Sequence, residues 1–160
     1  MGLELVARKK QPALILVHRR QLFDQWMDRI ESFLGIPKGE IGCYSGSKKT
    51  PGSGRITVAM IQTLSRGGVD QELYDSFGTV IVDECHHVPA RLFRETISRI
   101  SSYYLYGLTA TPIRKNNDED LIYVFIGKIL AEVPAGFLDA KSDSTIQIRI
   151  KETALQVPFG

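Results

Sequence analysis

The sequence contains no long apolar run and no basic leader followed by apolar residues. Its longest apolar stretches, such as Ala13–Val17, reach about five or six residues, against the roughly 20 needed to span a bilayer. We therefore expect an intracellular, cytoplasmic location rather than secretion. With 43% hydrophobic and 24% charged residues, the composition excludes a disordered or collagen-like chain and predicts one compact domain.

Cysteine and net charge are also scarce. Cys43 and Cys85 lie 42 positions apart, and neither belongs to a Cys-x-x-Cys pair. A single disulfide is one alternative, but a reduced intracellular protein is favoured, with Cys85 as a buried spacer because no base partner for a nucleophile is evident. The formal net charge of +2 does not by itself predict nucleic-acid binding. The basic residues do cluster in the first third of the chain: Arg8–Lys10, His18–Arg20, Lys48, Lys49 and Arg55.

Strand and helix patterns alternate along the chain. Short apolar runs predict strands at 13–17, 41–44, 56–60, 79–83 and 103–108, with a half-exposed strand at 146–150. Helical spacing predicts helices at 22–34, 69–74, 91–100 and 118–126, and residues 3–10 read as the end of another. A basic, glycine-rich turn is expected over 46–54. This order predicts an α/β fold: a mostly parallel sheet with helices on both faces, binding ligands at the carboxyl ends of its strands.

The strongest chemical signal is Asp83-Glu84-Cys85-His86-His87, directly after a predicted buried strand. One carboxylate can hold Mg²⁺ through its water shell, and the adjacent one can orient and deprotonate an attacking water. A solvated acidic turn is the simplest alternative. A metal-hydrolase cluster of Asp83, Glu84, His86 and His87 is another. It is disfavoured because adjacent histidines do not easily chelate one ion and the His-Glu-x-x-His spacing is absent.

A second signal, Thr109-Ala110-Thr111-Pro112, ends the next predicted strand. Its hydroxyl groups can hydrogen-bond neighbouring carboxylates or histidines, although threonines after a strand are by themselves typical of caps and turns. Twenty-six residues separate Asp83 from Thr109, which is one helix plus one strand. The two motifs are therefore predicted to lie on neighbouring strand ends.

Together these motifs resemble motifs II and III of the DExH-type superfamily 2 helicases. Segments 14–26, 54–66, 80–90 and 106–115 are similar to the branch of DNA-acting members that includes restriction-subunit-like (ResIII) and repair-type helicases. The resemblance covers about residues 3–135. It implies a RecA-like domain of the P-loop NTPase type, the first of two in an ATP-dependent helicase or translocase that moves on DNA.

The resemblance also implies roles for individual residues. Asp83 would bind the Mg²⁺ of Mg·ATP through water, and Glu84 would be the catalytic base. His86 would couple the nucleotide site to nucleic acid and to the second domain. The residues implied to link hydrolysis to movement are Thr109, Ala110 and Thr111. The residues implied to contact the nucleic-acid backbone are His18, Arg19 and Arg20 in motif Ia, with Gln62 and Thr63 in motif Ib.

Simpler interpretations stand beside these roles. Arg19 and Arg20 could be the solvated start of a helix, but a cation there opposes the helix dipole, which favours a functional reason. For Gln62 and Thr63 a capping turn remains an equal alternative. Trp26 is assigned to the core rather than to base stacking, because it lies on the apolar face of its predicted helix.

The sequence contains no Gly-x₄-Gly-Lys-Ser/Thr phosphate loop, which this family carries about thirty residues before motif Ia. The nearest imitation, Gly46–Thr50, fails the pattern and runs into a proline-glycine turn rather than a helix. We therefore expect a part of a longer protein, without the phosphate-loop strand and most of its helix. Residues 1–135 are expected to be a partial ATP-binding domain, and 136–160 a linker toward a second RecA-like domain.

Several expectations follow from that division. ATP and Mg²⁺ belong to the longer protein, and neither is expected to bind this chain alone. A sheet edge left open by the phosphate-loop strand is expected to favour self-association. The alternative function is a non-catalytic nucleic-acid-binding or scaffold domain of helicase ancestry, although such a domain would be expected to lose Glu84 or the threonines first. DNA rather than RNA as the partner rests on the family branch alone.

Overall fold

The computed structural model describes residues 2–67, 69–109, 126–127 and 129–131. The chain divides into two compact units, 1–126 and 127–160, and the helices and strands below all belong to the first. Ala110 and Thr111, the strand expected at 146–150 and the linker at 136–160 lie outside the described residues. So does all but the last residue of the helix expected at 118–126. The predicted boundary at 135 therefore stays a prediction.

Six strands form one sheet in the order β3-β2-β4-β1-β5-β6. Their bounds are Ala13–Val17 (β1), Gly42–Ser45 (β2), Lys48–Thr50 (β3), Ile56–Met60 (β4), Thr79–Asp83 (β5) and Tyr104–Leu108 (β6). Every neighbouring pair is parallel except β2 and β3. The predicted α/β class and mostly parallel sheet are confirmed.

The segment 46–54 is not only a turn, as expected, but also contains strand β3. Gly46 and Ser47 connect β2 to β3 as a two-residue hairpin, in which Ser45 pairs with Lys48. Gly46 has a φ of 60°, as such tight hairpin turns require. β3 has only three residues, all exposed, so it carries no apolar period that a sequence pattern could detect. Its lysines also suit the outer edge of a sheet.

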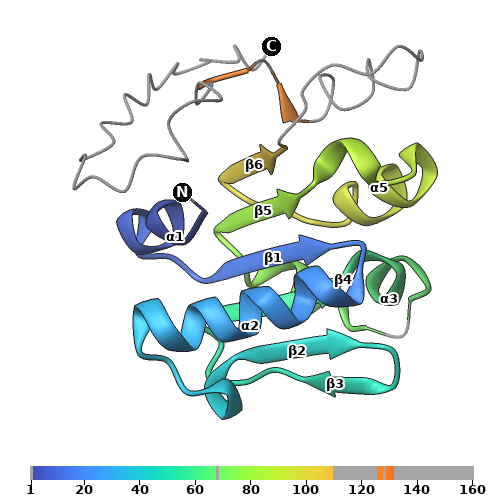
Figure 1. Ribbon diagram of the computed structural model, residues 1–160. Helices are drawn as coiled ribbons and strands as arrows, with labels where there is room; N and C mark the ends of the chain where they lie inside the picture. The colour runs from blue at the N-terminus through green and yellow to red at the C-terminus, as the bar shows by residue number, and fades with distance from the viewer. Residues whose placement is uncertain (1, 68, 110–125, 128, 132–160) are drawn as a thin grey trace, which may run out of the picture. The chain divides into compact units, whose positions relative to one another are not determined.

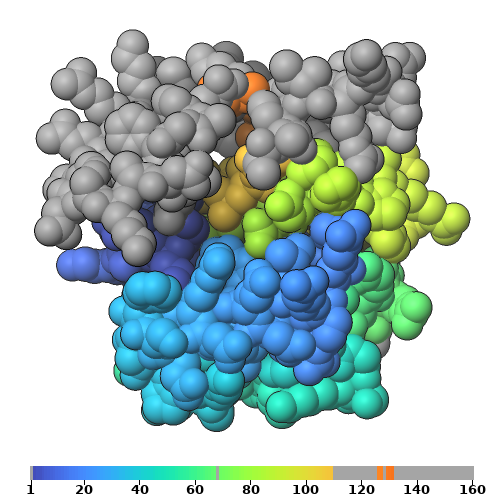
Figure 2. Space-filling view, in the orientation of Figure 1, coloured from blue at the N-terminus to red at the C-terminus, as the bar shows by residue number. Residues whose placement is uncertain are grey.

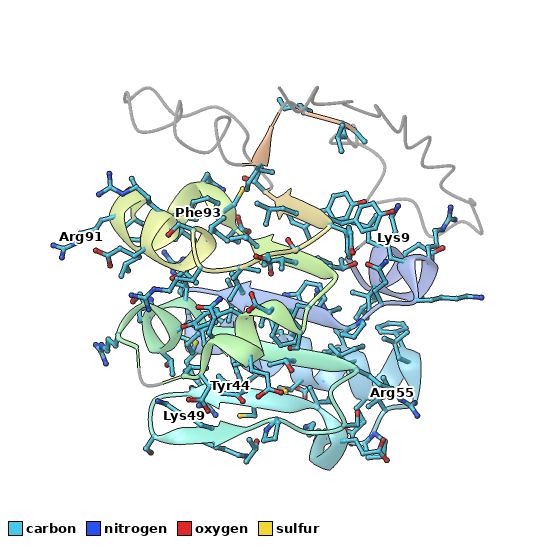
Figure 3. The ribbon with its side chains drawn as sticks, turned by 180° about the vertical axis from the view of Figure 1, so that it is seen from behind. Lys9, Tyr44, Lys49, Arg55, Arg91 and Phe93 are labelled. Atoms are coloured by element: carbon cyan, nitrogen blue, oxygen red, sulfur yellow. The ribbon has the colours of Figure 1, made fainter. Side chains whose placement is uncertain are left out.

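Helices cover both faces of the sheet, as predicted (Figure 1). Their bounds are Gly2–Lys9 (α1), Arg20–Leu34 (α2), Ile61–Ser65 (α3), Gln71–Asp75 (α4) and Ala90–Ile97 (α5), with short 3₁₀ turns at Lys38–Glu40 and Cys85–His87. Figure 2 shows α2 covering the middle of one face, and Figure 3 shows the opposite face, where Phe93 of α5 lies. The expected helix at 69–74 is α4, shifted by one or two residues, whereas no helix was expected at the position of α3. No helix in the described part of the chain is long and apolar enough to cross a membrane.

Strand β1 is the centre of the core, because it pairs with β4 on one side and β5 on the other. All five of its side chains are fully buried. Leu14 and Leu16 join a cluster with the apolar residues of α3, α4 and α5. Alternation along a strand therefore points Ala13, Ile15 and Val17 toward the face covered by α2.

The sequence of α2 explains its position. Phe23, Trp26 and Ile30 are its buried residues, spaced to form one apolar stripe. The helix ends at Gly35, whose left-handed backbone allows its N–H to donate to the carbonyl of Glu31 at 3.1 Å. The first residue of α2 directly follows the carboxyl edge of the sheet, so α2 begins at the edge where ligands are expected.

We predict that Ile15→Ala lowers the free energy of unfolding by about 2–5 kcal/mol, because it opens a cavity beneath α2. Urea unfolding followed by circular dichroism measures the change. Phe33→Ala is the matched control: Phe33 lies on α2 but is 76% exposed, so its loss is expected to change stability by no more than about 0.5 kcal/mol. Equal losses in the two variants would contradict this account of the core.

Candidate nucleotide and nucleic-acid site

The register of the parallel strands brings the motifs together. Asp83 of β5 pairs with Leu108 of β6, so Glu84 and Thr109 leave their strands side by side. Val17 of β1 pairs with Met60 of β4, so His18 emerges beside the start of α3. The described candidate residues all lie at or just beyond this carboxyl edge: His18, Arg19, Arg20, Gln62, Thr63, Asp83, Glu84, His86 and Thr109. The predicted juxtaposition of the two motifs is confirmed.

Both carboxylate oxygens of Asp83 accept a hydrogen bond. The backbone N–H of Glu84 donates to Oδ1 at 3.0 Å, and the indole Nε1–H of Trp26 donates to Oδ2 at 2.7 Å. Trp26 is only 6% exposed, so its assignment to the core is correct. Sequence reasoning missed its polar contact, since Trp26 and Asp83 lie 57 residues apart and the helical pattern reports only the apolar face.

Glu84 has a left-handed backbone, with a φ of 48°, where β5 passes into the turn Cys85–His87. Such a conformation is costly for a residue with a side chain, and it clusters at functional sites. Glu84 Oε2 is buried, accepts no hydrogen bond among the described residues, and lies 3.4 Å from Nδ1 of His86. That same ring nitrogen shares a hydrogen bond with the hydroxyl of Thr109. His86 thus joins the turn after β5 to the end of β6.

All three histidines of the chain gather at this edge. The ring centroids of His86 and His87 are 3.9 Å apart, and those of His18 and His87 are 5.8 Å apart. Glu84, His86 and His87 each offer one ligand atom within 4.8 Å of the others. That these adjacent histidines do not easily chelate one ion stays a prediction.

Mg²⁺ prefers oxygen ligands, and it usually keeps several of its waters. The nitrogen-rich group of Glu84, His86 and His87 does not fit that preference. Asp83 does, because a carboxylate offers about four acceptor positions and only two are used here. The donor set at the end of β5 therefore fits a hydrated Mg²⁺ held by Asp83.

The two arginines at the start of α2 differ in their surroundings. Arg20 donates from Nε to Asp24 at 3.0 Å and from Nη1 to the hydroxyl of Ser45 at 3.1 Å. Asp24 thereby offsets the unfavourable charge of Arg20 at the helix start. The helix dipole therefore gives less reason to assign Arg20 a functional role. Arg19 precedes the helix and is exposed, and no ion pair to it occurs within the described ranges. Arg19 is thus the cation better placed to meet an anionic partner.

Gln62 and Thr63 hold neighbouring loops together. Gln62 Nε2 donates to the carbonyl of His18 at 2.8 Å, and Thr63 Oγ1 accepts from the backbone N–H of Gly46 at 3.0 Å. These bonds tie the start of α3 to the loop after β1 and to the β2–β3 hairpin. Contact of Gln62 and Thr63 with nucleic acid stays a prediction. The observed bonds show that Gln62 also supports the loop that carries Arg19, and that Thr63 supports the β2–β3 hairpin.

Burial shapes the protonation of two residues. It lowers the pKa of His18, with further lowering from Arg19 and His87, and both ring nitrogens of His18 are buried without a hydrogen-bond partner among the described residues. Burial also raises the pKa of the Cys85 thiol to about 11. A Cβ on Gly107 would lie only 2.9 Å from the Cys85 sulfur, so glycine permits this close approach. Cys85 is a buried spacer as expected, and both cysteines are free thiols.

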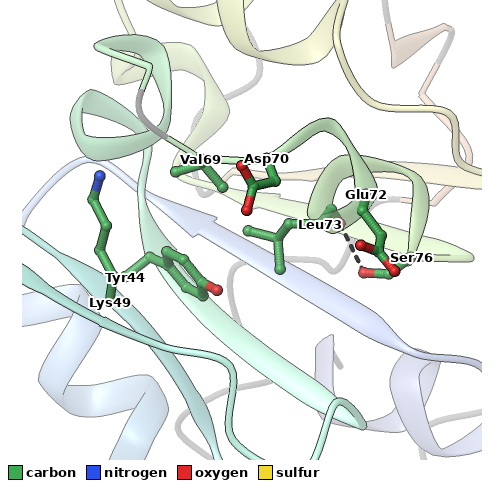
Figure 4. A pocket seen from close by; sticks show the side chains of 7 residues that line it. All are labelled: Tyr44, Lys49, Val69, Asp70, Glu72, Leu73 and Ser76. Carbon is green, nitrogen blue, oxygen red and sulfur yellow. Dashed lines mark hydrogen bonds between the residues drawn. The ribbon is translucent and has the colours of Figure 1, made fainter.

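A further concave feature lies elsewhere. A pocket of about 390 Å³ is lined by Tyr44 and Lys49 of the β2–β3 hairpin and by residues of the segment 69–76 (Figure 4). It contains none of the motif residues. The candidate site is therefore defined by the hydrogen bonds at the strand ends and by Glu84 Oε2, which accepts no hydrogen bond among the described residues. The pocket does not define it.

Comparison with known proteins shows the family to which the chain belongs. Residues 3–114 match the family model described as the type III restriction enzyme, res subunit. The putative DNA 3'-5' helicase Rad25 of Haloarcula marismortui is 36% identical over 118 residues, which cover 71% of this chain and 18% of that protein. The putative ATP-dependent RNA helicase L396 of Acanthamoeba polyphaga mimivirus is 32% identical over 131 residues, covering 81% and 24%. The chain thus spans a quarter or less of the length of these relatives.

Solved structures share the fold. The UvsW helicase of bacteriophage T4 superposes with a TM-score of 0.61 at 20% identity, covering 73% of this chain and 43% of that one. The SWI2/SNF2 ATPase core of Sulfolobus solfataricus, solved with double-stranded DNA, has a TM-score of 0.57 at 16% identity, covering 81% and 28%. The sheet and its helices are therefore those of a RecA-like helicase domain.

We predict that His18 makes folding sensitive to pH. Its folded pKa is lowered below the ordinary value of 6.5, so the unfolded chain binds more protons as the pH falls through that value. Stability is therefore lost from about pH 6.5 downward, until the pH passes the folded pKa. Urea unfolding at about pH 7.5 and about pH 5.5 should show a smaller loss in His18→Asn than in the wild type. Identical losses would show that His18 does not contribute.

Proposed function

Because this chain belongs to the family of type III restriction enzyme res subunits and has the fold of a RecA-like helicase domain, we propose that it works within an ATP-dependent DNA helicase or translocase. In this proposal it supplies the Mg²⁺ carboxylate, the catalytic base and part of the DNA-contacting surface. The longer protein supplies the phosphate loop, the second RecA-like domain and its arginine. The type of reaction is ATP hydrolysis coupled to movement along DNA.

The observation that carries the proposal is the hydrogen bond between His86 and Thr109. These residues lie 23 positions apart and belong to two different motifs. They meet next to Oε2 of Glu84, which is buried and accepts no hydrogen bond among the described residues. Because His86 contacts both Glu84 and the end of β6, it can transmit a change at the nucleotide site to the neighbouring strand. A simple acidic turn has no need of this arrangement.

The residues of this edge divide the chemistry among them. Asp83 would hold Mg²⁺ through water, which in Mg·ATP neutralises charge on the phosphates. Glu84 would accept a proton from the attacking water through its unpaired oxygen. His86 and Thr109, followed in the sequence by Ala110 and Thr111, would couple hydrolysis to movement of the second domain.

DNA binding would use the positive start of α2. Arg19 is exposed there, and the carbonyl of His18 is fixed by Gln62. An exposed arginine can bind phosphates and so position a DNA strand without reading its sequence. DNA as the partner follows the name of the Rad25 relative and the DNA complex of the SWI2/SNF2 core, while the mimiviral relative is named as an RNA helicase.

The 160-residue chain alone is proposed not to hydrolyse ATP. It contains no Gly-x₄-Gly-Lys-Ser/Thr loop, and without one the phosphates lose most of their ligands. Among the described strands, β6 has a neighbour on one side only, and all of its residues are partly exposed. We infer that this edge accepts another strand, either from the longer protein or from a second copy of the chain.

The proposal predicts that Glu84→Gln lowers the turnover number for ATP hydrolysis in the longer protein by at least about 100-fold, because the base is lost. Glu95→Gln, the same chemical change on α5 away from the site, should leave turnover nearly unchanged. DNA-stimulated phosphate release measures both. Unchanged turnover in Glu84→Gln would contradict the proposal that this domain supplies the catalytic base.

Arg19→Ala is expected to weaken duplex DNA binding and to reduce the salt dependence by one phosphate contact, a change of about 0.9 in the slope of log K against log salt. Arg29→Ala is the matched control, since Arg29 is exposed near the middle of the same helix. Fluorescence anisotropy with labelled DNA measures both slopes. Equal effects of the two substitutions would remove Arg19 from the DNA site. Stronger competition by structured RNA than by duplex DNA would instead change the partner.

A further inference from the structure

Trp26 is the single tryptophan of the chain, and its one polar group is used at the proposed metal site. The indole N–H donates to Asp83 Oδ2 over 2.7 Å, at the short end of the range for N–H···O bonds. Indole nitrogen is a donor only, so this bond is its whole hydrogen-bonding capacity. Because the acceptor is a carboxylate, the bond is of the stronger, charge-assisted kind.

The packing around Trp26 fixes the indole in place. The side chain lies on the buried stripe of α2 and is 6% exposed. On its outer side it meets α1 at Gly2, where an added Cβ would lie 2.5 Å from Cη2 of the ring. The absence of a side chain at Gly2 is therefore what allows α1 to close over the indole. A ring held in this way cannot turn its N–H away without moving a helix.

Each of the two oxygens of the Asp83 carboxylate is consequently held by one donor. The Glu84 N–H donates to one oxygen and the Trp26 indole to the other, so rotation about the side-chain torsions would break at least one bond. About two of its roughly four acceptor positions remain for metal-bound water. A carboxylate that already has its final orientation loses less conformational freedom when it binds a hydrated ion.

We propose that Trp26 is a positioning residue for the Mg²⁺-binding carboxylate of Asp83, an inference that rests on the proposed function of Asp83. It does not touch nucleotide or metal. It sets the orientation of the group that does. The proposed DNA contact Arg19 directly precedes the same helix, so the donor to Asp83 and the DNA-contacting surface are joined through α2.

The bond can be observed directly in this chain. With one tryptophan, a ¹⁵N-labelled sample gives one indole cross-peak in a proton–nitrogen correlation spectrum. Asp83→Asn keeps the shape of the acceptor but removes its charge, and it is expected to move the indole proton upfield. An indole cross-peak that is indifferent to Asp83→Asn would overturn the proposal.

The effect on the reaction is measured in the longer protein. Trp26→Phe retains the aromatic packing and removes the donor, and it is expected to raise the Mg²⁺ concentration for half-maximal ATP hydrolysis about ten-fold. Turnover at saturating Mg²⁺ should change much less. Phe23→Leu, a cavity on the same buried stripe without a contact to Asp83, should lower the amount of folded protein but not shift the Mg²⁺ dependence. A Mg²⁺ dependence unchanged in Trp26→Phe would contradict a positioning role.

The two experiments separate the inference from its premise. If the wild-type longer protein hydrolyses no ATP, the proposed function fails, while the indole cross-peak still reports whether Trp26 holds Asp83. If ATP is hydrolysed but the cross-peak is unchanged in Asp83→Asn, the positioning role fails alone. Should Trp26→Phe not fold, the Asp83→Asn comparison decides, since it leaves the core intact.

Discussion

The parallel register of β1, β4, β5 and β6 is the constraint on which the rest of the structure depends. Four strands that run in one direction end at one edge, and the pairing of Asp83 with Leu108 sets which residues meet there. A slip of one residue would turn each side chain to the opposite face of the sheet. A slip of β6 would separate His86 from Thr109, and a slip of β1 would move Leu14 and Leu16 out of the core cluster. The apolar packing that holds the register is therefore also what assembles the site.

The site has a rigid part and a connecting part. The rigid part is the carboxylate of Asp83, held by a backbone N–H and by an indole that two helices enclose. The connecting part is His86, which contacts Glu84 on one side and the end of β6 on the other. An ATPase that drives movement needs both, because the metal must stay in place while the state of the nucleotide is passed to another domain.

Much of this could be predicted from the sequence, for identifiable physical reasons. Strands buried on both faces are continuous apolar runs, so β1 and β5 were evident, and the spacing between Asp83 and Thr109 required neighbouring strand ends. β3 could not be predicted, since three exposed polar residues carry no period. The bond from Trp26 to Asp83 was equally hidden, because its partners are distant in sequence and a helical pattern describes only which face is apolar. The intrachain bonds of Gln62 likewise depend on a loop position that the sequence does not encode locally.

We propose that this chain carries the metal and base groups of an ATPase site but not the groups that hold the phosphates. Isothermal titration of Mg·ATP into the 160-residue chain, with the longer protein in parallel, tests it most directly. The account predicts stoichiometric binding by the longer protein and no detectable heat of binding with the chain alone. Tight, stoichiometric binding by the chain alone would reveal a phosphate site among its own residues and would contradict the account.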